Sequence, residues 1–362
     1  MKGTFCCDGF KCLFLGVLIE ISAMKKPNLT IKDIAKALNI SVSTVSRALN
    51  NHPDISRETI EMVQNYAKEH KYTPNSLALS LRTKQSNIIG VIVPELANHF
   101  FSSVLSGMEM VAEEEDYRVI VCQSSENSEK EKHNIQTLIN ARVCGVLVSM
   151  AKTTTDYRHF KELVDSEIPL VFFDRICTGI DSSKVVVDDY YGTFTAVDYM
   201  IRSGCRRIAF LGATLNLEIS KNRRNGYLDA LIKHGLPVDE NLIRQADTKQ
   251  LGYQEAMDLL QSDLRPDAFM AMNDYTASGV LCATKQLRLK VPEEVSIFGF
   301  SNSNISQDTD PMLSTMDQHP QKVGEEAMRL IIEHIKGQGG ERTKNRLVRT
   351  TMILRETTRR IE

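Results

Sequence analysis

The 362-residue sequence contains no tryptophan and lacks the residue clusters that carry most enzyme chemistry. It has no glycine-rich phosphate loop and no serine nucleophile elbow, and no cluster combines His, Cys and Asp at metal-ligand spacing. These absences argue against an enzyme and against a metal site. We therefore expect a protein that acts by binding and that needs no cofactor.

The eight cysteines form no convincing framework for disulfides or for a metal. Cys6, Cys7 and Cys12 lie close together, but no histidine lies near them. The remaining cysteines are widely scattered, at Cys122, Cys144, Cys177, Cys205 and Cys282. Single cysteines in apolar runs are typical of reduced core residues in a cytoplasmic protein.

The apolar run over residues 12–19 is too short to span a membrane. Lys11 precedes it and Glu20 ends it, as in the core of a signal peptide, but no convincing small-residue cleavage pattern follows. We interpret residues 1–23 as an extension that precedes the true start at Met24. A membrane tether is the alternative, and we expect no membrane partner.

Charge is unevenly distributed along the chain, although the formal net charge is only −2. Residues 24–85 carry 10 Lys and Arg against 5 Asp and Glu, whereas residues 86–362 carry 32 against 39. A small basic block on a larger acidic body is typical of a nucleic-acid-binding head. The alternative is a chance excess of lysine on a solvated face.

Three short amphipathic helices are predicted in the basic block. Thr30, Ser41 and Ser56 each precede a helical pattern and can cap its first turn. Apolar residues recur at helical spacing after each cap, at Ile31, Ile34, Ala35 and Leu38, then at Val42, Val45 and Leu49, and finally at Ile60, Val63 and Ala67. We expect the third helix to pack across the other two.

The second of these helices has a polar outer surface made of Ser43, Thr44, Ser46, Arg47 and Asn50. Small hydrogen-bonding side chains with one forked donor suit the major groove of double-stranded DNA. There, arginine reads guanine, and serine or threonine reaches bases or phosphates. The alternative is a purely structural three-helix bundle.

A fourth, very short helix is predicted over residues 75–82. Pro74 ends the preceding helix, and Asn75 can cap a further turn. A helix of this length is marginal in isolation and needs a partner to fold. We expect DNA to be that partner.

Residues 30–35 (TIKDIA), 41–50 (SVSTVSRALN) and 72–75 (YTPN) together resemble the head of the LacI/GalR family of transcription regulators. The resemblance implies base contacts by Val42, Ser43 and Arg47. It implies phosphate contacts by Thr30, Thr44, Ser46 and Asn50. It also makes residues 75–82 a hinge helix, with the site residues Ala78, Leu81 and Arg82.

In that hinge, the resemblance implies that Leu81 wedges into the minor groove beside Ala78. The alternative for Leu81 is an ordinary linker leucine packed on the body.

The body, residues 86–362, alternates strand-like with helical runs. Strands are predicted over 88–93, 118–122, 145–148, 169–174, 207–212, 268–272 and 296–300. Helices are predicted between them, over 102–115, 129–140, 190–203 and 222–234. Continuous apolar strands that alternate with helices indicate parallel sheets covered on both faces. We expect two doubly wound halves with a cleft at the carboxyl ends of their strands.

Residues that follow these strands are the candidates for binding a ligand. They are Asn98, Phe101, Asp174, Asn273, Asp274 and Ser301, with Arg223 early in a helix of the second half. Arg223 and Asp274 together suit neighbouring hydroxyl groups, because one side chain donates and the other accepts. The alternatives are that Asp274 only caps a helix, that Asp174 is a structural turn residue, and that Arg223 pairs with a surface carboxylate.

The body also resembles the effector domain of the LacI/GalR family, which is similar to periplasmic sugar-binding proteins. The motifs that carry this resemblance lie at residues 98–101, 173–175, 188–192, 223–227, 273–274 and 291–296. In the family, the positions of Arg223 and Asp274 hydrogen-bond the effector. The chain departs from the family at Ser301, where aspartate is frequent, and around residues 247–249, where no aromatic ring is present.

Together these features predict an all-α helix-turn-helix head joined to a periplasmic-binding-protein-like α/β body. We expect the head at residues 24–74, the hinge and linker at 75–85 and the effector domain at 86–362. Within that domain, one half is predicted over residues 86–187 and 316–343 and the other over 188–315 and 344–358.

The expected function is a cytoplasmic repressor of transcription whose affinity for its operator is controlled by a sugar or sugar derivative. A regulator that responds to a nucleobase or another metabolite, and a transcription activator, are the alternatives. The operator is expected to be pseudo-palindromic and bound by a homodimer, because two-fold symmetry doubles the base contacts of one head. No leucine heptad tail follows residues 354–358, so we expect no coiled-coil tetramer.

Overall fold

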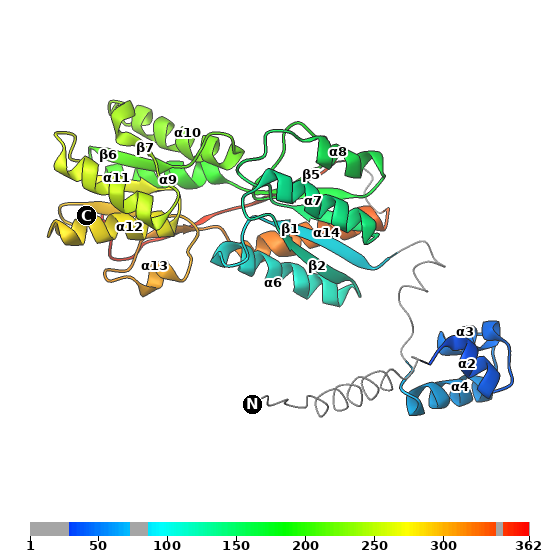
Figure 1. The fold of residues 1–362 in the computed structure, drawn as a ribbon. Coiled ribbons are helices and arrows are strands. Elements are labelled where there is room, and N and C mark those ends of the chain that lie inside the picture. Colours follow the sequence, from blue (N-terminus) through cyan, green and yellow to red (C-terminus); the bar gives the residue numbers. More distant parts are fainter. Residues whose placement is uncertain (1–28, 73–85, 338–342, 362) are drawn as a thin grey trace, which may run out of the picture. The chain divides into compact units, whose positions relative to one another are not determined.

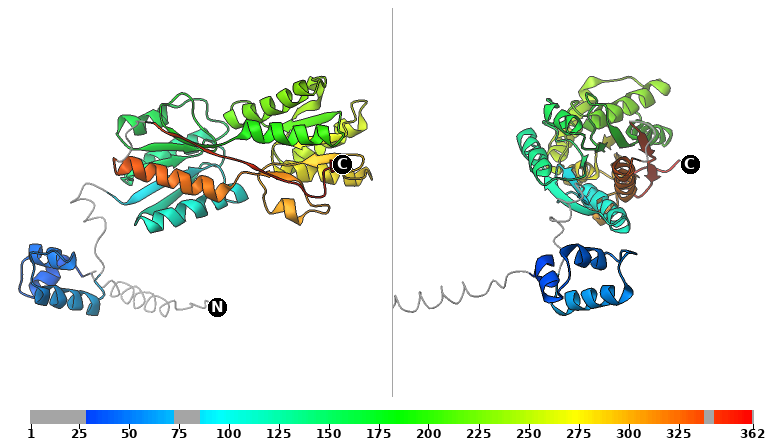
Figure 2. Two further views of the ribbon diagram at one scale, coloured as in Figure 1. Left: turned by 180° about the vertical axis from the view of Figure 1, so that it is seen from behind. Right: turned by 90° about the vertical axis from the view of Figure 1, so that its right-hand side faces the viewer.

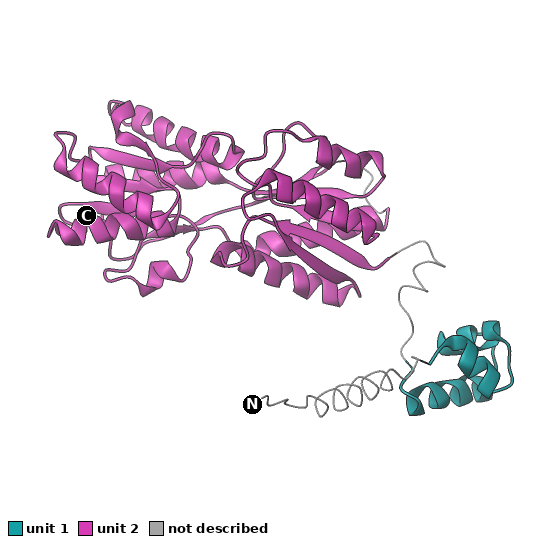
Figure 3. Ribbon diagram, in the orientation of Figure 1, with its two compact units in different colours: residues 1–85 teal, residues 86–362 magenta. Residues whose placement is uncertain are grey.

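The computed structural model describes residues 29–72, 86–337 and 343–361, which divide into two compact units, residues 1–85 and 86–362 (Figure 3). The predicted extension over residues 1–23 and the hinge residues Ala78, Leu81 and Arg82 lie outside the described residues. Within the described ranges, no helix is both long and apolar enough to cross a membrane.

The first unit contains the three predicted helices, α2 (Ile31–Ala37), α3 (Val42–Leu49) and α4 (Arg57–Glu69). Each predicted cap is confirmed: Thr30, Ser41 and Ser56 accept hydrogen bonds from the backbone N–H groups three residues later. The helices enclose a small core of Ile34, Ala35, Val45, Ala48, Val63 and Ala67. Its small size follows from the short helices, each of which contributes only two or three buried side chains.

The second unit consists of two lobes (Figure 1). The first lobe is built on a six-stranded parallel sheet with the order β11-β5-β4-β3-β1-β2. Its strands are β1 (Ile88–Val93), β2 (Arg118–Gln123), β3 (Gly145–Val148), β4 (Leu170–Phe173), β5 (Ser183–Val187) and β11 (Asn345–Val348). Its helices are α6 (His99–Glu114), α7 (Ser128–Asn140), α8 (Arg158–Asp165) and α14 (Pro320–Ile335).

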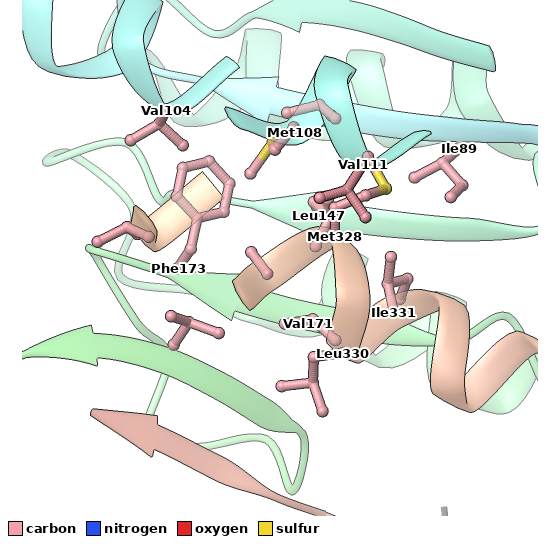
Figure 4. Close-up of a cluster of buried hydrophobic side chains, with 14 of the residues drawn as sticks. Ile89, Val104, Met108, Val111, Leu147, Val171, Phe173, Met328, Leu330 and Ile331 are labelled. Carbon is pink, nitrogen blue, oxygen red and sulfur yellow. The ribbon is translucent and has the colours of Figure 1, made fainter. Parts of the chain in front are cut away.

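Helices α6 and α14 pack side by side on one face of this sheet (Figure 4). Val104, Met108 and Val111 of α6 meet Met328 and Ile331 of α14 over the sheet in one continuous apolar cluster. Helices α7 and α8 contribute to a second cluster, which also includes residues of β3 and β4. Both faces of the sheet are therefore covered, which explains why its central strands are apolar throughout.

The second lobe is built on a four-stranded parallel sheet with the order β7-β6-β8-β9. Its strands are β6 (Ile208–Gly212), β7 (Ile243–Gln245), β8 (Ala268–Ala271) and β9 (Ser296–Phe298). Its helical segments are α9 (Asp189–Arg202), α10 (Glu218–Lys233), η1 (Glu240–Leu242), α11 (Lys249–Gln261), α12 (Asp274–Gln286) and α13 (Ile305–Asp308). Helices α9 and α10 form one apolar cluster with this sheet, and α11 and α12 form the other.

The described chain passes between the lobes at three places, and Figure 2 shows two of these segments from behind. The first passage joins β5 to α9. The others run through β10 (Thr315–Asp317) and β12 (Thr351–Ile353), which pair antiparallel with each other. The sequence-based division at residue 344 is wrong for one strand: β11 pairs with β5, so it belongs to the first lobe and not to the second.

The contact between α6 and α14 gives a first prediction. A Cβ added at Gly324 would lie 2.0 Å from the backbone oxygen of Val104. Alanine favours a helix over glycine by about 1 kcal/mol, but this overlap with backbone can be relieved only by moving the helices apart. We expect Gly324→Ala to destabilise the second unit by a net 1–3 kcal/mol, roughly the cost of overpacking a core.

Thermal unfolding measures this change. Ser106→Ala is the matched control, because Ser106 is an exposed position on α6. A melting temperature for Gly324→Ala equal to or above that of Ser106→Ala would contradict the close helix contact.

Candidate effector pocket and DNA-binding face

A cavity of about 370 Å³ lies between the two lobes of the second unit. All seven residues predicted to bind an effector line it, namely Asn98, Phe101, Asp174, Arg223, Asn273, Asp274 and Ser301. They come from both lobes because the carboxyl ends of the strands in both sheets face this cavity. The volume lies in the range that accommodates a small molecule.

Arg223 is held by a buried ion pair. Its side chain is only 3% exposed, and its guanidinium lies 2.7 Å from Oδ1 of Asp189 in the first turn of α9. It also donates a hydrogen bond to the backbone oxygen of Met272 and lies over the ring of Phe300, 3.8 Å from the centroid. Burial raises the pKa of Asp189, and the positive charge of Arg223 opposes that shift. The alternative that Arg223 pairs with a surface carboxylate is therefore wrong, because its partner Asp189 is buried.

Asp274 is fully buried, and the protein occupies both of its oxygens. Oδ2 accepts hydrogen bonds from the backbone N–H and the hydroxyl of Ser303, and Oδ1 accepts one from the hydroxyl of Thr315 at 2.6 Å. Burial raises the pKa of Asp274 to about 6 despite these donors. Its carboxylate thus fixes the loop after β9 against the start of α12.

The helix cap at this point is the neighbouring residue. Asn273 caps α12 by accepting from the backbone N–H of Thr276 at 2.8 Å, and its amide donates to the backbone oxygen of Asp247. The interpretation of Asp274 as a simple cap is therefore wrong, because Asp274 is already the first residue of the helix.

Asp174 differs from the other acids of the pocket. It follows β4 with φ at 57°, and only 6% of it is exposed. No hydrogen bond from a described residue reaches its carboxylate, and Nε of Arg175 approaches it to 3.9 Å. Burial raises its pKa to about 6. Asp174 thus provides a buried acceptor that no hydrogen bond from the described residues occupies.

Ser301 contacts Gln318, a pocket residue that was not predicted from the sequence. Its hydroxyl donates to Oε1 of Gln318 at 2.7 Å, and Nε2 of Gln318 is buried without a hydrogen-bond partner among the described residues. Gln318 lies between β10 and α14, on one of the passages between the lobes, and it lines the cavity. The connecting segment that carries Gln318 has neither the strand nor the helix pattern of apolar residues, so nothing in the sequence marked Gln318 as a pocket residue.

The remaining predicted residues lie at the first-lobe side of the cavity. Asn98 caps α6 by accepting from the backbone N–H of Phe100 at 2.9 Å, and Phe101 is buried. At the edge of the cavity, Lys152 of the first lobe forms an ion pair with Asp247 of the second, with 3.0 Å between Nζ and Oδ2. This pair bridges the lobes outside the sheets.

The predicted DNA-reading residues lie on or beside α3 in the first unit. Val42, Ser43 and Arg47 are exposed, and Val42 is 42% exposed despite its apolar side chain. A single exposed valine is ordinary on a protein surface, so the exposure of Val42 is compatible with a base contact but does not by itself indicate one. The structure thus brings the three predicted base-contacting residues to the outer side of one helix.

The residues predicted to contact phosphates differ in how exposed their side chains are. Thr30 is exposed, but its hydroxyl donates to Asp33 within a capping box at the start of α2. Ser46 is buried, and the amide of Asn50 donates to its backbone oxygen at 2.8 Å. Thr44 is half-buried, with its hydroxyl 2.8 Å from that of Ser41. Their expected phosphate contacts remain predictions.

Comparison with known proteins gives two family matches. Residues 30–75 match the bacterial regulatory proteins of the lacI family, and residues 197–358 match a periplasmic binding protein-like domain. The chain is 31% identical to catabolite control protein A of Priestia megaterium over 310 residues, 85% of this chain and 93% of that protein. It is 30% identical to the HTH-type transcriptional repressor CytR of Escherichia coli K12 over 331 residues, 91% and 96% of the two chains.

Among solved structures, the fold is similar to that of the lac repressor dimer bound to operator and the anti-inducer ONPF. The TM-score is 0.82 at 25% identity, over 91% of this chain and 99% of that one. The relatives are transcription regulators and not enzymes. The helix-turn-helix head, the two-lobed α/β body and these similarities lead to one conclusion: the chain is a DNA-binding transcription regulator and belongs to the lacI family of bacterial regulatory proteins.

Proposed function

We propose that this protein is a cytoplasmic repressor that binds a pseudo-palindromic operator as a homodimer and changes its operator affinity when a sugar occupies the cleft. The observation that carries the proposal is the convergence of seven predicted ligand residues from both lobes on one cavity. A ligand that contacts both lobes biases their relative position, which is the property that an effector requires.

The hydrogen-bonding groups of the cavity support a sugar as the effector. Asp174 offers an acceptor that no described residue uses, and Nε2 of Gln318 offers a donor without a partner. A hydroxyl group donates and accepts at once, so neighbouring hydroxyls on a sugar satisfy both kinds of group.

The size of the reading surface supports a dimer. One head presents Val42, Ser43 and Arg47 as base-contacting side chains, which is few for a specific site. Two heads related by two-fold symmetry double these contacts and require a pseudo-palindromic operator. The similar lac repressor was solved as a dimer on its operator.

The hinge completes the proposal, although it lies outside the described residues. We expect residues 75–82 to form a helix on the operator, with Leu81 beside Ala78 in the minor groove and Arg82 as a further DNA-binding residue. An effector that shifts the lobes would then change the spacing of the two hinges in the dimer.

The DNA-binding face gives a second prediction, on Arg47. Replacing Arg47 with alanine removes the forked donor that reads guanine and costs roughly 1–3 kcal/mol for each half-site. One base position in each half-site should also lose its preference. Fluorescence anisotropy on an operator selected from random DNA with the wild-type protein measures both effects.

Lys68→Ala is the control for Arg47→Ala, because it removes one positive charge from the last turn of α4 on the same unit. The assignment of α3 as the reading helix fails if Arg47→Ala keeps the affinity and the sequence preference of the Lys68→Ala protein.

Asp174 gives a third prediction, on the effector. Asp174→Asn replaces an acceptor by an amide of nearly the same size, so the sugar should bind at least tenfold more weakly while operator binding without sugar is unchanged. Because the pKa of Asp174 is raised to about 6, its carboxylate is lost as the pH falls through that value. Wild-type sugar affinity should therefore fall between pH 7.5 and pH 5.

The measurement is calorimetric titration with whichever sugar alters operator binding in a screen. Asp165→Asn is the control, since Asp165 is an exposed acid at the end of α8 in the same lobe. Equal sugar affinity in the Asp174→Asn and Asp165→Asn proteins would remove Asp174 from the binding site.

A further inference from the structure

We propose that the cleft admits an uncharged, hydroxyl-rich effector and excludes phosphorylated and carboxylated sugars, because the buried cations at its wall are already held by carboxylates of the protein. This inference rests on the proposed function and specifies the chemical class of its effector. The ion pairs around the cavity support it, because they leave no buried cation free for a ligand.

The deepest cation is Arg223, and it is neutralised by Asp189. Nε and Nη2 of Arg223 lie 2.8 and 2.7 Å from Oδ1 of Asp189, and Nη1 is used by the backbone oxygen of Met272. Both charged side chains are almost completely buried. Little of the positive charge of Arg223 therefore remains for a ligand.

The second cation is Arg175, and it is neutralised by Glu126. Nη1 of Arg175 lies 2.7 and 2.8 Å from the two carboxylate oxygens of Glu126, with the Arg175 side chain 16% exposed. The Nε atom of Arg175 faces Asp174 at 3.9 Å, so a second carboxylate also draws on its charge.

The other cations near the cavity lie at its exposed edge. Lys152 forms the ion pair with Asp247 across the lobes, and Lys249 is an exposed residue at the start of α11. Water and salt screen an exposed charge, so its attraction for a ligand is small. Glu95, which is also exposed and lines the cavity, adds a negative charge at the edge.

The acids of the interior have no comparable compensation. No described cation comes closer to Asp174 than Arg175 at 3.9 Å, and the charge of Arg223 acts on Asp174 only from a distance. The hydrogen-bond donors to Asp274 are hydroxyl and backbone groups, and the charge of Arg355 acts on it without a direct contact. A phosphate or carboxylate that entered would lose its hydration and would face these two carboxylates. Desolvation of an anion is compensated only by cations or several converging donors. Nε of Arg175 is a buried donor without a partner among the described residues, but it faces Asp174 at 3.9 Å, so an anion that reached it would also meet that carboxylate.

An uncharged polyol meets none of these penalties. Its hydroxyls can donate to Asp174 and accept from the unpartnered amide of Gln318, and Ser301 adjoins that amide. The same arrangement therefore favours hydroxyls and rejects anions.

The test restores a free cation to the cleft. Asp189→Asn removes the negative charge beside Arg223, and Glu126→Gln does so beside Arg175 while it leaves Asp174 in place. The matched control is Glu240→Gln, which frees Arg224 on the outside of α10, where Nη2 and Glu240 Oε1 lie 3.0 Å apart. Each protein is checked for folding by circular dichroism and then titrated calorimetrically with ribose 5-phosphate and with inorganic phosphate.

We expect no binding of either probe to the wild type or to Glu240→Gln at millimolar concentration, and at least tenfold tighter binding to the variants of the cleft. Glu126→Gln provides the answer if Asp189→Asn does not fold. Binding of ribose 5-phosphate to the wild type would overturn the proposal, and so would the absence of any gain over Glu240→Gln in the folded variants.

Failure of this proposal can be distinguished from failure of the proposed function. A phosphorylated sugar that releases the operator would contradict the charge rule and leave the effector-controlled repressor intact. A protein whose operator affinity responds to no sugar would contradict the proposed function, whatever the phosphate titrations show.

Discussion

The buried ion pair between Asp189 and Arg223 is the interaction on which the rest of the pocket depends. Asp189 begins α9 directly after the first passage between the lobes, and Arg223 extends from α10 to the end of β8 and over the ring of Phe300. One side chain of α10 thus contacts α9 and the residues that follow β8 and β9 at the wall of the cavity. Removing one partner of such a pair typically costs about 3–5 kcal/mol, because the other charge stays buried. The pair also neutralises the most deeply buried cation of the wall, on which the proposed selectivity partly depends.

The passages between the lobes link this wall to movement of the body. Asp189 directly follows one connecting segment, and Gln318 lies on another. Asp174 belongs to the first lobe, so a ligand that contacts both Asp174 and Gln318 touches that lobe and a connecting segment at once. The ion pair between Lys152 and Asp247 adds a contact across the cleft, and the backbone oxygen of Asp247 accepts from Asn273 inside the pocket. Under the proposed function, occupancy of the cavity and the arrangement of the lobes are therefore coupled through a few hydrogen bonds.

The sequence predicted the features that depend on local interactions. Caps at Thr30, Ser41 and Ser56, and the apolar central strands, follow from neighbouring residues alone. The short strands β5, β7, β10, β11 and β12 were not predicted, because their pairing joins distant segments and their composition is mixed. For the same reason β11 was assigned to the wrong lobe. Strand ends and the family resemblance located the pocket residues, but only the tertiary structure shows that Asp189 neutralises Arg223 and that Gln318 enters the cavity.

The central claim is that the cleft and the DNA-binding head are coupled within one regulator. The most direct test is a reciprocal pair of titrations: operator affinity with and without the sugar, and sugar affinity with and without the operator. Linkage requires that the two affinities change by the same factor, and we expect that factor to be at least fivefold. A sugar that binds in the cleft while both factors stay at one would contradict the account.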